Sequence, residues 1–237
     1  MNRNLLATTL AGAVLAPMLL ATMAQAEPKL GSRLIQRETR DTTRARDNGS
    51  AVRAAHRFAA CLYLKRGASV RGLMTSLAPA DQERYERSLS RQVDCNNSVT
   101  LSDGAVAEGL QITSSPDVMR GMYAEAILDT IKDDEALQPA PSQASYTREW
   151  FAITGRDPIV DEMAVCVADQ NPAGIRALLA TSAETPEELA AARALAPSLG
   201  PCLPQGATLK ANRQGLRAAL AEALFHRATA PALAATN

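Results

Sequence analysis

The four cysteines form two pairs with almost the same spacing, and this pattern limits the fold more than any other feature of the chain. Cys61 precedes Cys95 by 34 positions, and Cys166 precedes Cys202 by 36. Aligning Cys166 with Cys61 also matches nearby residues without a gap: Met163 with Phe58, Ile175 with Val70, Arg176 with Arg71, Leu178 with Leu73 and Leu179 with Met74. Such self-similarity predicts two copies of one small folding unit.

The first 26 residues carry the features of a secretory signal. Arg3 precedes a long apolar run, and small residues end that run at Ala26, as a signal peptidase requires. An uncleaved membrane anchor is the alternative, because the run is nearly as long as the roughly 20 residues of a spanning helix. Gly12 and Pro17 interrupt the run. We therefore expect cleavage near Ala26 and a periplasmic or secreted mature chain without a transmembrane segment.

Export changes what the cysteines are expected to do, because thiols pair in oxidising compartments and stay reduced in the cytosol. Four cysteines allow three connectivities. The repeat selects the one with each bridge inside its own copy, Cys61 with Cys95 and Cys166 with Cys202. A four-thiolate zinc site is the alternative, but the short spacing of zinc ligands is absent from the sequence. The sequence thus predicts two disulfides, no metal and no cofactor.

The composition favours helices and argues against nucleic-acid partners. Apolar residues make up 46% of the chain and aromatic residues only 3%, so the core must be built from aliphatic side chains at helical spacing. There are 25 Lys and Arg residues against 25 Asp and Glu, and loss of Arg3 with the signal changes the net charge from zero to minus one. A strongly basic surface for nucleic acid is therefore not expected.

The sequence predicts an all-α, internally duplicated fold of two tandem four-helix units, each with one disulfide, packed about a pseudo-twofold axis. We expect a signal peptide (1–26), a polar Arg-rich segment (27–50), a first helical repeat (51–132), a linker containing Trp150 and Phe151 (133–156), a second helical repeat (157–228) and a tail (229–237). In the first repeat, Gly67 is expected to end one helix and Pro79 the next. Asn171 and Pro172 replace the glycine in the second repeat, and Thr185 should cap its third helix.

Three charged positions are the same in both copies. Arg71 matches Arg176, and residues 119–127 match residues 216–224, which aligns Arg120 with Arg217 and Glu125 with Glu222. An arginine and a glutamate five residues apart on one helix do not face each other. We therefore predict that the second helix of each copy is tied to the fourth by a structural ion pair, Arg71 with Glu125 and Arg176 with Glu222. An anion or peptide site lined by the arginines is the alternative.

Trp150 and Phe151, adjacent in the linker, have two interpretations. A lone aromatic pair bordering two halves is typical of packing between them. The same pair can also serve as a platform for a ligand. Together with Arg120 and Arg217, these residues form the candidate interaction surface.

Catalytic signatures are missing from the sequence, so we predict no catalytic residue. The chain contains only two histidines, His56 and His226. Motifs of metalloproteases, serine hydrolases, calcium loops and phosphate-binding loops are absent from the sequence. A hydrolase site assembled from residues distant in sequence is the alternative, for example His56 with Asp94 or Glu108.

The sequence is compatible with three functions. The first is a non-catalytic exported protein that binds another protein or a peptide in the cell envelope, with an apolar groove near Trp150 and Phe151. The second is a periplasmic, hydrolase-like enzyme in which an acid, a histidine and an arginine converge. In the third, the Arg-rich segment holds an anionic layer, and binding weakens as salt is raised. Partner identity and oligomeric state are outside what the sequence predicts.

Overall fold

The computed structural model describes residues 48–90, 95, 99–100, 105–107, 112, 114–131, 138–207, 209 and 212–229. This part of the chain is helical apart from one pair of two-residue strands, which confirms the predicted all-α class. The signal peptide, residues 27–47 of the Arg-rich segment and all but the first residue of the predicted tail lie outside the described residues.

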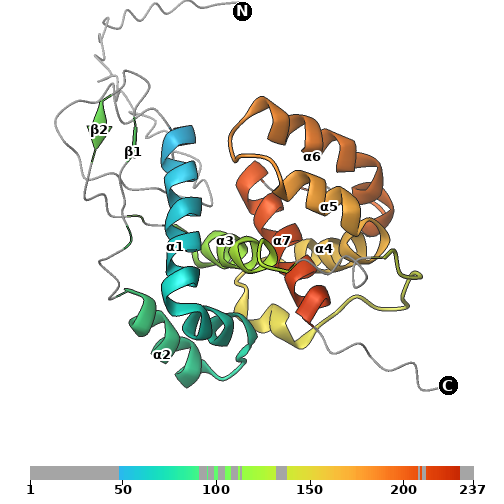
Figure 1. Ribbon diagram of the computed structural model, residues 1–237. Helices are drawn as coiled ribbons and strands as arrows, with labels where there is room; N and C mark the ends of the chain where they lie inside the picture. The colour runs from blue at the N-terminus through green and yellow to red at the C-terminus, as the bar shows by residue number, and fades with distance from the viewer. Residues whose placement is uncertain are drawn as a thin grey trace, which may run out of the picture.

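The elements follow one another along the chain as Figure 1 shows. They are α1 (Asn48–Thr75), α2 (Pro79–Ser90), β1 (Val99–Thr100), β2 (Val106–Ala107), α3 (Pro116–Leu128), the 3-10 helix η3 (Glu149–Ile153), α4 (Pro158–Gln170), α5 (Pro172–Leu179), α6 (Pro186–Leu199), the 3-10 helix η4 (Gly200–Cys202) and α7 (Arg213–Thr229). The two strands pair antiparallel, with Val99 opposite Ala107.

The two helices predicted before Pro79 are continuous in the structure. Helix α1 departs from helical geometry at Arg66 (φ −137°, ψ 37°) and then resumes. Gly67 does not adopt the left-handed conformation that a glycine C-cap requires, so α1 kinks there and does not end. Pro79 begins α2 and does not terminate the preceding helix, which agrees with the preference of proline for a first helical turn.

The later helix boundaries agree better with the sequence. Asn171 separates α4 from α5, and its side chain accepts a hydrogen bond from the Gly174 amide at 2.9 Å. Thr185 caps α6 by accepting from the Glu188 amide at 3.2 Å. Each cap satisfies an amide that has no partner within its own helix.

Helices α3 and α7 pack against each other at the centre of the molecule, with α1 against α3 and α4 against α7. Their close approach depends on small residues, since a methyl group added at Gly121 would lie 2.3 Å from the Ala218 backbone. Buried apolar residues from all four helices form one cluster. The described part of the chain therefore has a single continuous core.

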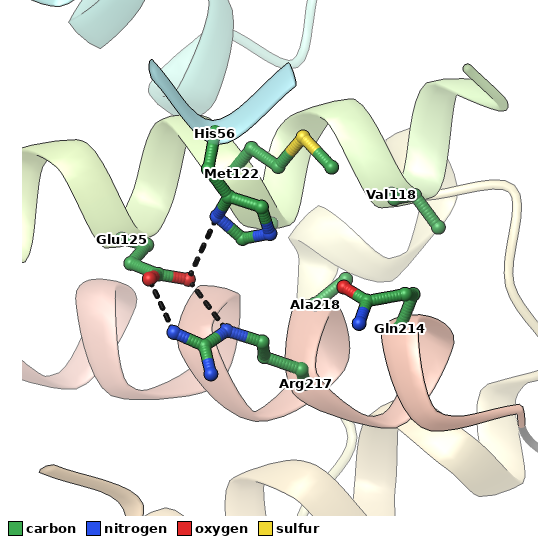
Figure 2. Close-up of a pocket in the computed structure, with 8 residues that line it drawn as sticks. His56, Val118, Met122, Glu125, Gln214, Arg217 and Ala218 are labelled. Carbon is green, nitrogen blue, oxygen red and sulfur yellow. Dashed lines mark hydrogen bonds and ion pairs between the residues drawn. The ribbon is translucent and has the colours of Figure 1, made fainter. Parts of the chain in front are cut away.

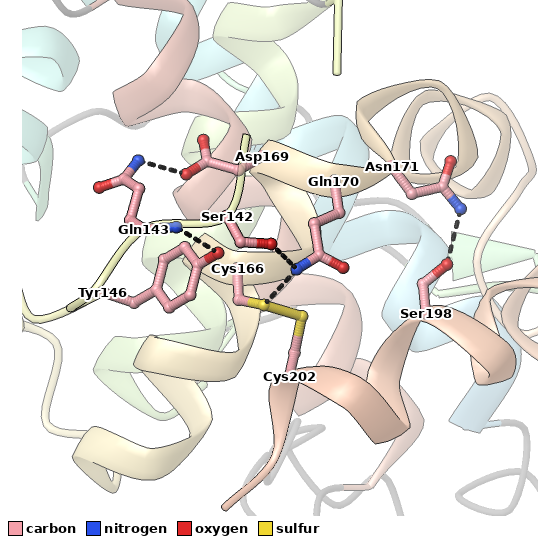
Figure 3. Close-up of a disulfide and its surroundings, with 9 residues drawn as sticks. All are labelled: Ser142, Gln143, Tyr146, Cys166, Asp169, Gln170, Asn171, Ser198 and Cys202. Atoms are coloured by element: carbon pink, nitrogen blue, oxygen red, sulfur yellow. Dashed lines mark hydrogen bonds between the residues drawn. A yellow bond between two sulfur atoms is a disulfide. The ribbon is translucent and has the colours of Figure 1, made fainter. Parts of the chain in front are cut away.

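Both predicted disulfides are present, Cys61 with Cys95 and Cys166 with Cys202. The second joins α4 to η4, and Figure 3 shows Gln170 donating to the Cys166 sulfur at 3.3 Å. Beside it, the linker is fastened to the end of α4, because Gln143 donates to the Asp169 carboxylate at 2.6 Å. The bridge and the linker thus hold the same end of α4.

Candidate functional site

The matched arginines and glutamates meet across the interface of α3 and α7. Arg120 Nε donates to Glu222 Oε1 at 2.8 Å. Arg217 Nε donates to Glu125 Oε2 at 2.9 Å. Each helix therefore supplies the arginine of one pair and the glutamate of the other. These pairs replace the predicted ones, in which Glu125 and Glu222 were assigned to arginines of their own copies.

Each of these arginines also binds two consecutive carbonyl groups at the end of a neighbouring helix. Arg120 donates to the Leu73 and Met74 carbonyls at 3.0 and 3.3 Å. Arg217 donates to the Leu178 and Leu179 carbonyls at 3.1 and 3.0 Å. Carbonyls in the last turn of a helix lack intrahelical donors. Each buried guanidinium supplies donors both to these carbonyls and to its glutamate partner.

The other two matched arginines have different partners from those predicted. Arg71 donates to the Tyr63 hydroxyl, and its guanidinium lies over the Tyr63 ring. Arg176 donates to the Leu128 and Ile131 carbonyls at 2.9 and 3.2 Å, at the end of α3. Glu125 and Glu222 lie in the α3–α7 interface, where they face the arginine of the opposite helix.

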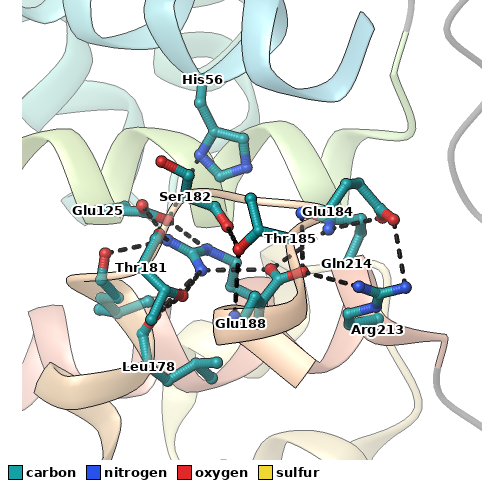
Figure 4. A network of polar contacts seen from close by, with 12 residues as sticks. His56, Glu125, Leu178, Thr181, Ser182, Glu184, Thr185, Glu188, Arg213 and Gln214 are labelled. Carbon is teal, nitrogen blue, oxygen red and sulfur yellow. Dashed lines mark hydrogen bonds and ion pairs between the residues drawn. The ribbon is translucent and has the colours of Figure 1, made fainter. Parts of the chain in front are cut away.

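We define the His56 cluster as His56, Glu125, Glu188, Gln214 and Arg217 (Figures 2 and 4). His56 Nδ1 lies 3.4 Å from Glu125 Oε2. On the other side, Arg217 reaches Glu188 Oε1 at 3.2 Å. Gln214 donates to the Glu188 carboxylate at 3.4 Å. The cluster therefore joins α1, α3, α6 and α7.

Burial dominates the electrostatics of the histidine in this cluster. It lowers the pKa of His56 below its ordinary value of 6.5, and Arg217 lowers it further, while Glu125 and Glu188 act in the opposite direction. His56 Nε2 is buried and has no hydrogen-bond partner. The imidazole is therefore neutral at pH 7.

We define the Glu222 cluster as Arg120, Arg156, Asp161, Glu222 and His226. Arg156 bridges Asp161 Oδ1 and Glu222 Oε2, each at 2.6 Å. His226 Nε2 lies 3.8 Å from Glu222 Oε1, beyond hydrogen-bond distance. Burial alone would raise the pKa of Glu222, but His226 and the two arginines lower it to about 2. Glu222 is therefore ionised at neutral pH inside the core.

The proposed interaction surface does not form as one exposed face. Arg120 and Arg217 are only 4% and 2% exposed, because both side chains are enclosed by the α3–α7 interface. Trp150 is 9% exposed and stacks on His226 with ring centroids 4.2 Å apart. Phe151 meets the Trp150 ring edge-on and is half-buried. The aromatic pair therefore packs the linker against α7.

The His56 cluster has the residue types of an acid–base site but no space for a substrate. His56, Glu125, Gln214 and Arg217 pack so closely that no water molecule fits among them and the neighbouring residues Val118, Gly121, Met122 and Ala218. The Arg217 donors are used by carboxylates and carbonyls. Asp94 and Glu108, the acids considered as partners of His56, lie outside the described residues. The geometry therefore supports a structural role.

The sequence analysis missed Arg156, Asp161 and Glu188 as members of these clusters. One signal was present, because aligning Cys166 with Cys61 also aligns Asp161 with His56. Both are polar residues on otherwise apolar helix stripes, and such residues need buried partners. The cross-helix partners follow from the packing of α3 on α7, which the sequence does not show.

No group of three metal-ligating side chains occurs among the described residues. In the same part of the chain, none of the helices is both long and apolar enough to cross a membrane. Comparisons with protein-family models, with curated proteins and with solved structures found no match to this chain.

Proposed function

We propose that this protein is an exported, non-catalytic helical module that binds another protein or a peptide in the cell envelope. The observation that carries the non-catalytic part is the closed His56 cluster, where an acid, a histidine and an arginine meet without room for a substrate. The two disulfides support export, because such bridges persist in oxidising compartments. The apolar run and small residues before Ala26 supply the signal for it.

We further propose that residues 51–132 and 157–228 are duplicated units related by a pseudo-twofold axis between α3 and α7. The reciprocal Arg–Glu pairs support this arrangement, since a twofold contact places the same residues on both sides. The backbone break at Arg66 (φ −137°, ψ 37°) also has its counterpart at Asn171 (φ −140°, ψ 59°), the aligned position.

An exposed leucine on α1 supports the choice of a protein partner. Leu64 is 81% exposed, the most exposed of the large apolar side chains described. It lies three residues after Cys61, whose disulfide to Cys95 ties the β1–β2 segment to α1. On β2, Val106 is 58% exposed. Apolar side chains exposed in this way supply binding energy when a partner covers them.

The test is capture of envelope proteins by the immobilised mature chain with intact disulfides. The variant Leu64→Glu should lose the captured protein, because a charge replaces the apolar contact. Leu189→Glu is the matched control, since Leu189 is an exposed leucine on α6 (37%), and it should retain the partner. Equal capture by both variants would contradict the proposed surface.

The two alternative functions give different results in the same experiment. An enzyme would turn over a substrate in a hydrolase panel and lose that activity in His56→Gln. Binding through the Arg-rich segment would be lost steeply as salt is raised and would be unaffected by Leu64→Glu. Turnover that depends on His56, with no captured partner, would favour the enzyme over the binding module.

A further inference from the structure

His56 is a largely buried residue that lies between helices and can change its charge near neutral pH. Its ring extends from α1 into the contact between α3 and α7 (Figure 2), with Nδ1 3.4 Å from Glu125 Oε2. Nε2 is buried without a hydrogen-bond partner. A second proton on this ring would therefore place a positive charge inside the protein, close to that of Arg217, which is costly.

The groups around His56 come from three other helices. Helix α3 contributes Glu125 and Asp129, α6 contributes Glu188, and α7 contributes Arg217 and the neutral Gln214. Burial and Arg217 oppose protonation of the ring, and the carboxylates and Gln214 favour it. The carboxylate nearest to His56, that of Glu125, also accepts from Arg217, and the positive charge of Arg217 opposes protonation of the ring.

The second histidine is placed differently. His226 and Glu222 lie four residues apart on the same helix, α7. His226 therefore contacts a carboxylate of its own helix, although its Nε2 is also buried without a hydrogen-bond partner. His56 and Glu125 lie on different helices, so protonation of His56 acts on the contact of α1 with α3 and α7.

We propose that neutral His56 closes α1 onto α3 and α7, and that protonation of His56 in mild acid loosens this contact. The sign follows from the lowered pKa of the buried ring. The unfolded or opened form takes up the proton first, at its ordinary pKa of 6.5, so the closed form loses stability as the pH falls below that value. Each unit of pKa lowering allows up to about a tenfold increase in the opening equilibrium.

The first test is thermal unfolding of the oxidised mature protein at pH 7.5 and pH 5.5. The difference in midpoint between the two pH values should be larger for wild type than for His56→Gln by roughly 2–4 °C. Leu189→Gln on α6, an exposed position (37%), is the control and should behave as wild type. An equal pH dependence in wild type and His56→Gln would overturn the proposal.

A second measurement does not depend on the folding of a His56 variant. His226→Gln leaves His56 as the single histidine, and its ring protons should titrate with a midpoint below 6.5. Hydrogen exchange at pH 5.5, corrected for intrinsic rates, should become faster in residues 48–65 of α1 and stay unchanged in α4. A midpoint at or above 6.5, or equal acceleration in both helices, would reject the acid-sensitive contact.

Discussion

The His56 and Glu222 clusters each contain a central Arg–Glu pair, but the residues around the two pairs differ. Glu222 is fully buried and binds two arginines, Arg120 and Arg156. Glu125 is 13% exposed and binds one, Arg217, which also has a second carboxylate partner in Glu188. Glu222 thus binds two arginines, one of which also pairs with Asp161, whereas Arg217 is shared by two glutamates.

This difference shows that residues at matching positions of the sequence can have unequal roles in one core. Removing Glu222 leaves an excess positive charge where no water reaches it. Removing Glu125 leaves Arg217 still paired with Glu188 and with backbone carbonyls. The energetic cost of breaking a buried pair depends on which charge remains unpaired.

The largest expected effect tests this difference directly. Glu222→Gln should lower the free energy of unfolding by about 3–5 kcal/mol, the typical cost of breaking a buried pair. The matched variant Glu125→Gln should cost roughly 1–2 kcal/mol, because one charge-assisted hydrogen-bond partner is lost. Urea unfolding at pH 7 measures both. Equal losses of unfolding free energy in the two variants would show that the neighbouring charges do not make one Arg–Glu pair more important than the other.

The two disulfides extend the comparison to the two halves of the chain. Replacing Cys61 and Cys95, or Cys166 and Cys202, by alanine should each lower stability by about 3–4 kcal/mol in the chain-entropy model. The loops span 34 and 36 residues, so the two losses should agree within about 0.5 kcal/mol. Urea unfolding of both double variants is the measurement. A clearly larger difference between the two losses would mean that native packing around one bridge contributes more to stability than loop closure does.

Gly121 offers a way to disturb both clusters at once, because it sets the approach of α3 to α7. Gly121→Ala should cost about 1–3 kcal/mol through overpacking, since the new methyl group meets Ala218 backbone atoms. Gly200→Ala is the matched control. Gly200 has helical dihedral angles and open space at the Cβ position, so stability should stay the same or rise by at most about 1 kcal/mol. Similar results for the two glycines in urea unfolding would contradict this packing.

Acid separates the clusters by pH and gives the smallest effect. The pKa of Glu222 is lowered from 4.5 to about 2, so the stabilisation from its charge is complete above pH 4.5 and is lost as the pH falls towards 2. The stabilisation from neutral His56 is lost below pH 6.5. Urea unfolding at pH 7, 5 and 3 should show that Glu222→Gln reduces only the loss between pH 5 and 3. A change between pH 7 and 5 in that variant would contradict the assignment.

Much of the local structure could be predicted from residue patterns. The repeat and its nearly equal cysteine spacing selected the observed disulfides, and Thr185 marked a helix start that the structure has. The kink at Arg66 was read as a helix end, because a glycine beside a break resembles a C-cap until its dihedral angles are known.

The candidate site was predicted less well, for a physical reason. Arg120, Glu125, Arg217 and Glu222 were identified as equivalent charged positions, yet their partners were assigned within each copy. The observed pairs join residues 102 and 92 positions apart. Only the packing of α3 on α7 brings them within reach, and local periodicity contains no information about that contact.

The amino-acid sequence by itself determined the helical class, the cap at Thr185 and the cysteine pairing, because these depend on short-range periodicity and on spacing. The tertiary structure alone decided which charges meet and which side chains stay exposed. Ion pairs in a core depend on how two helices cross and how far water is excluded, and both properties arise only when distant segments pack together.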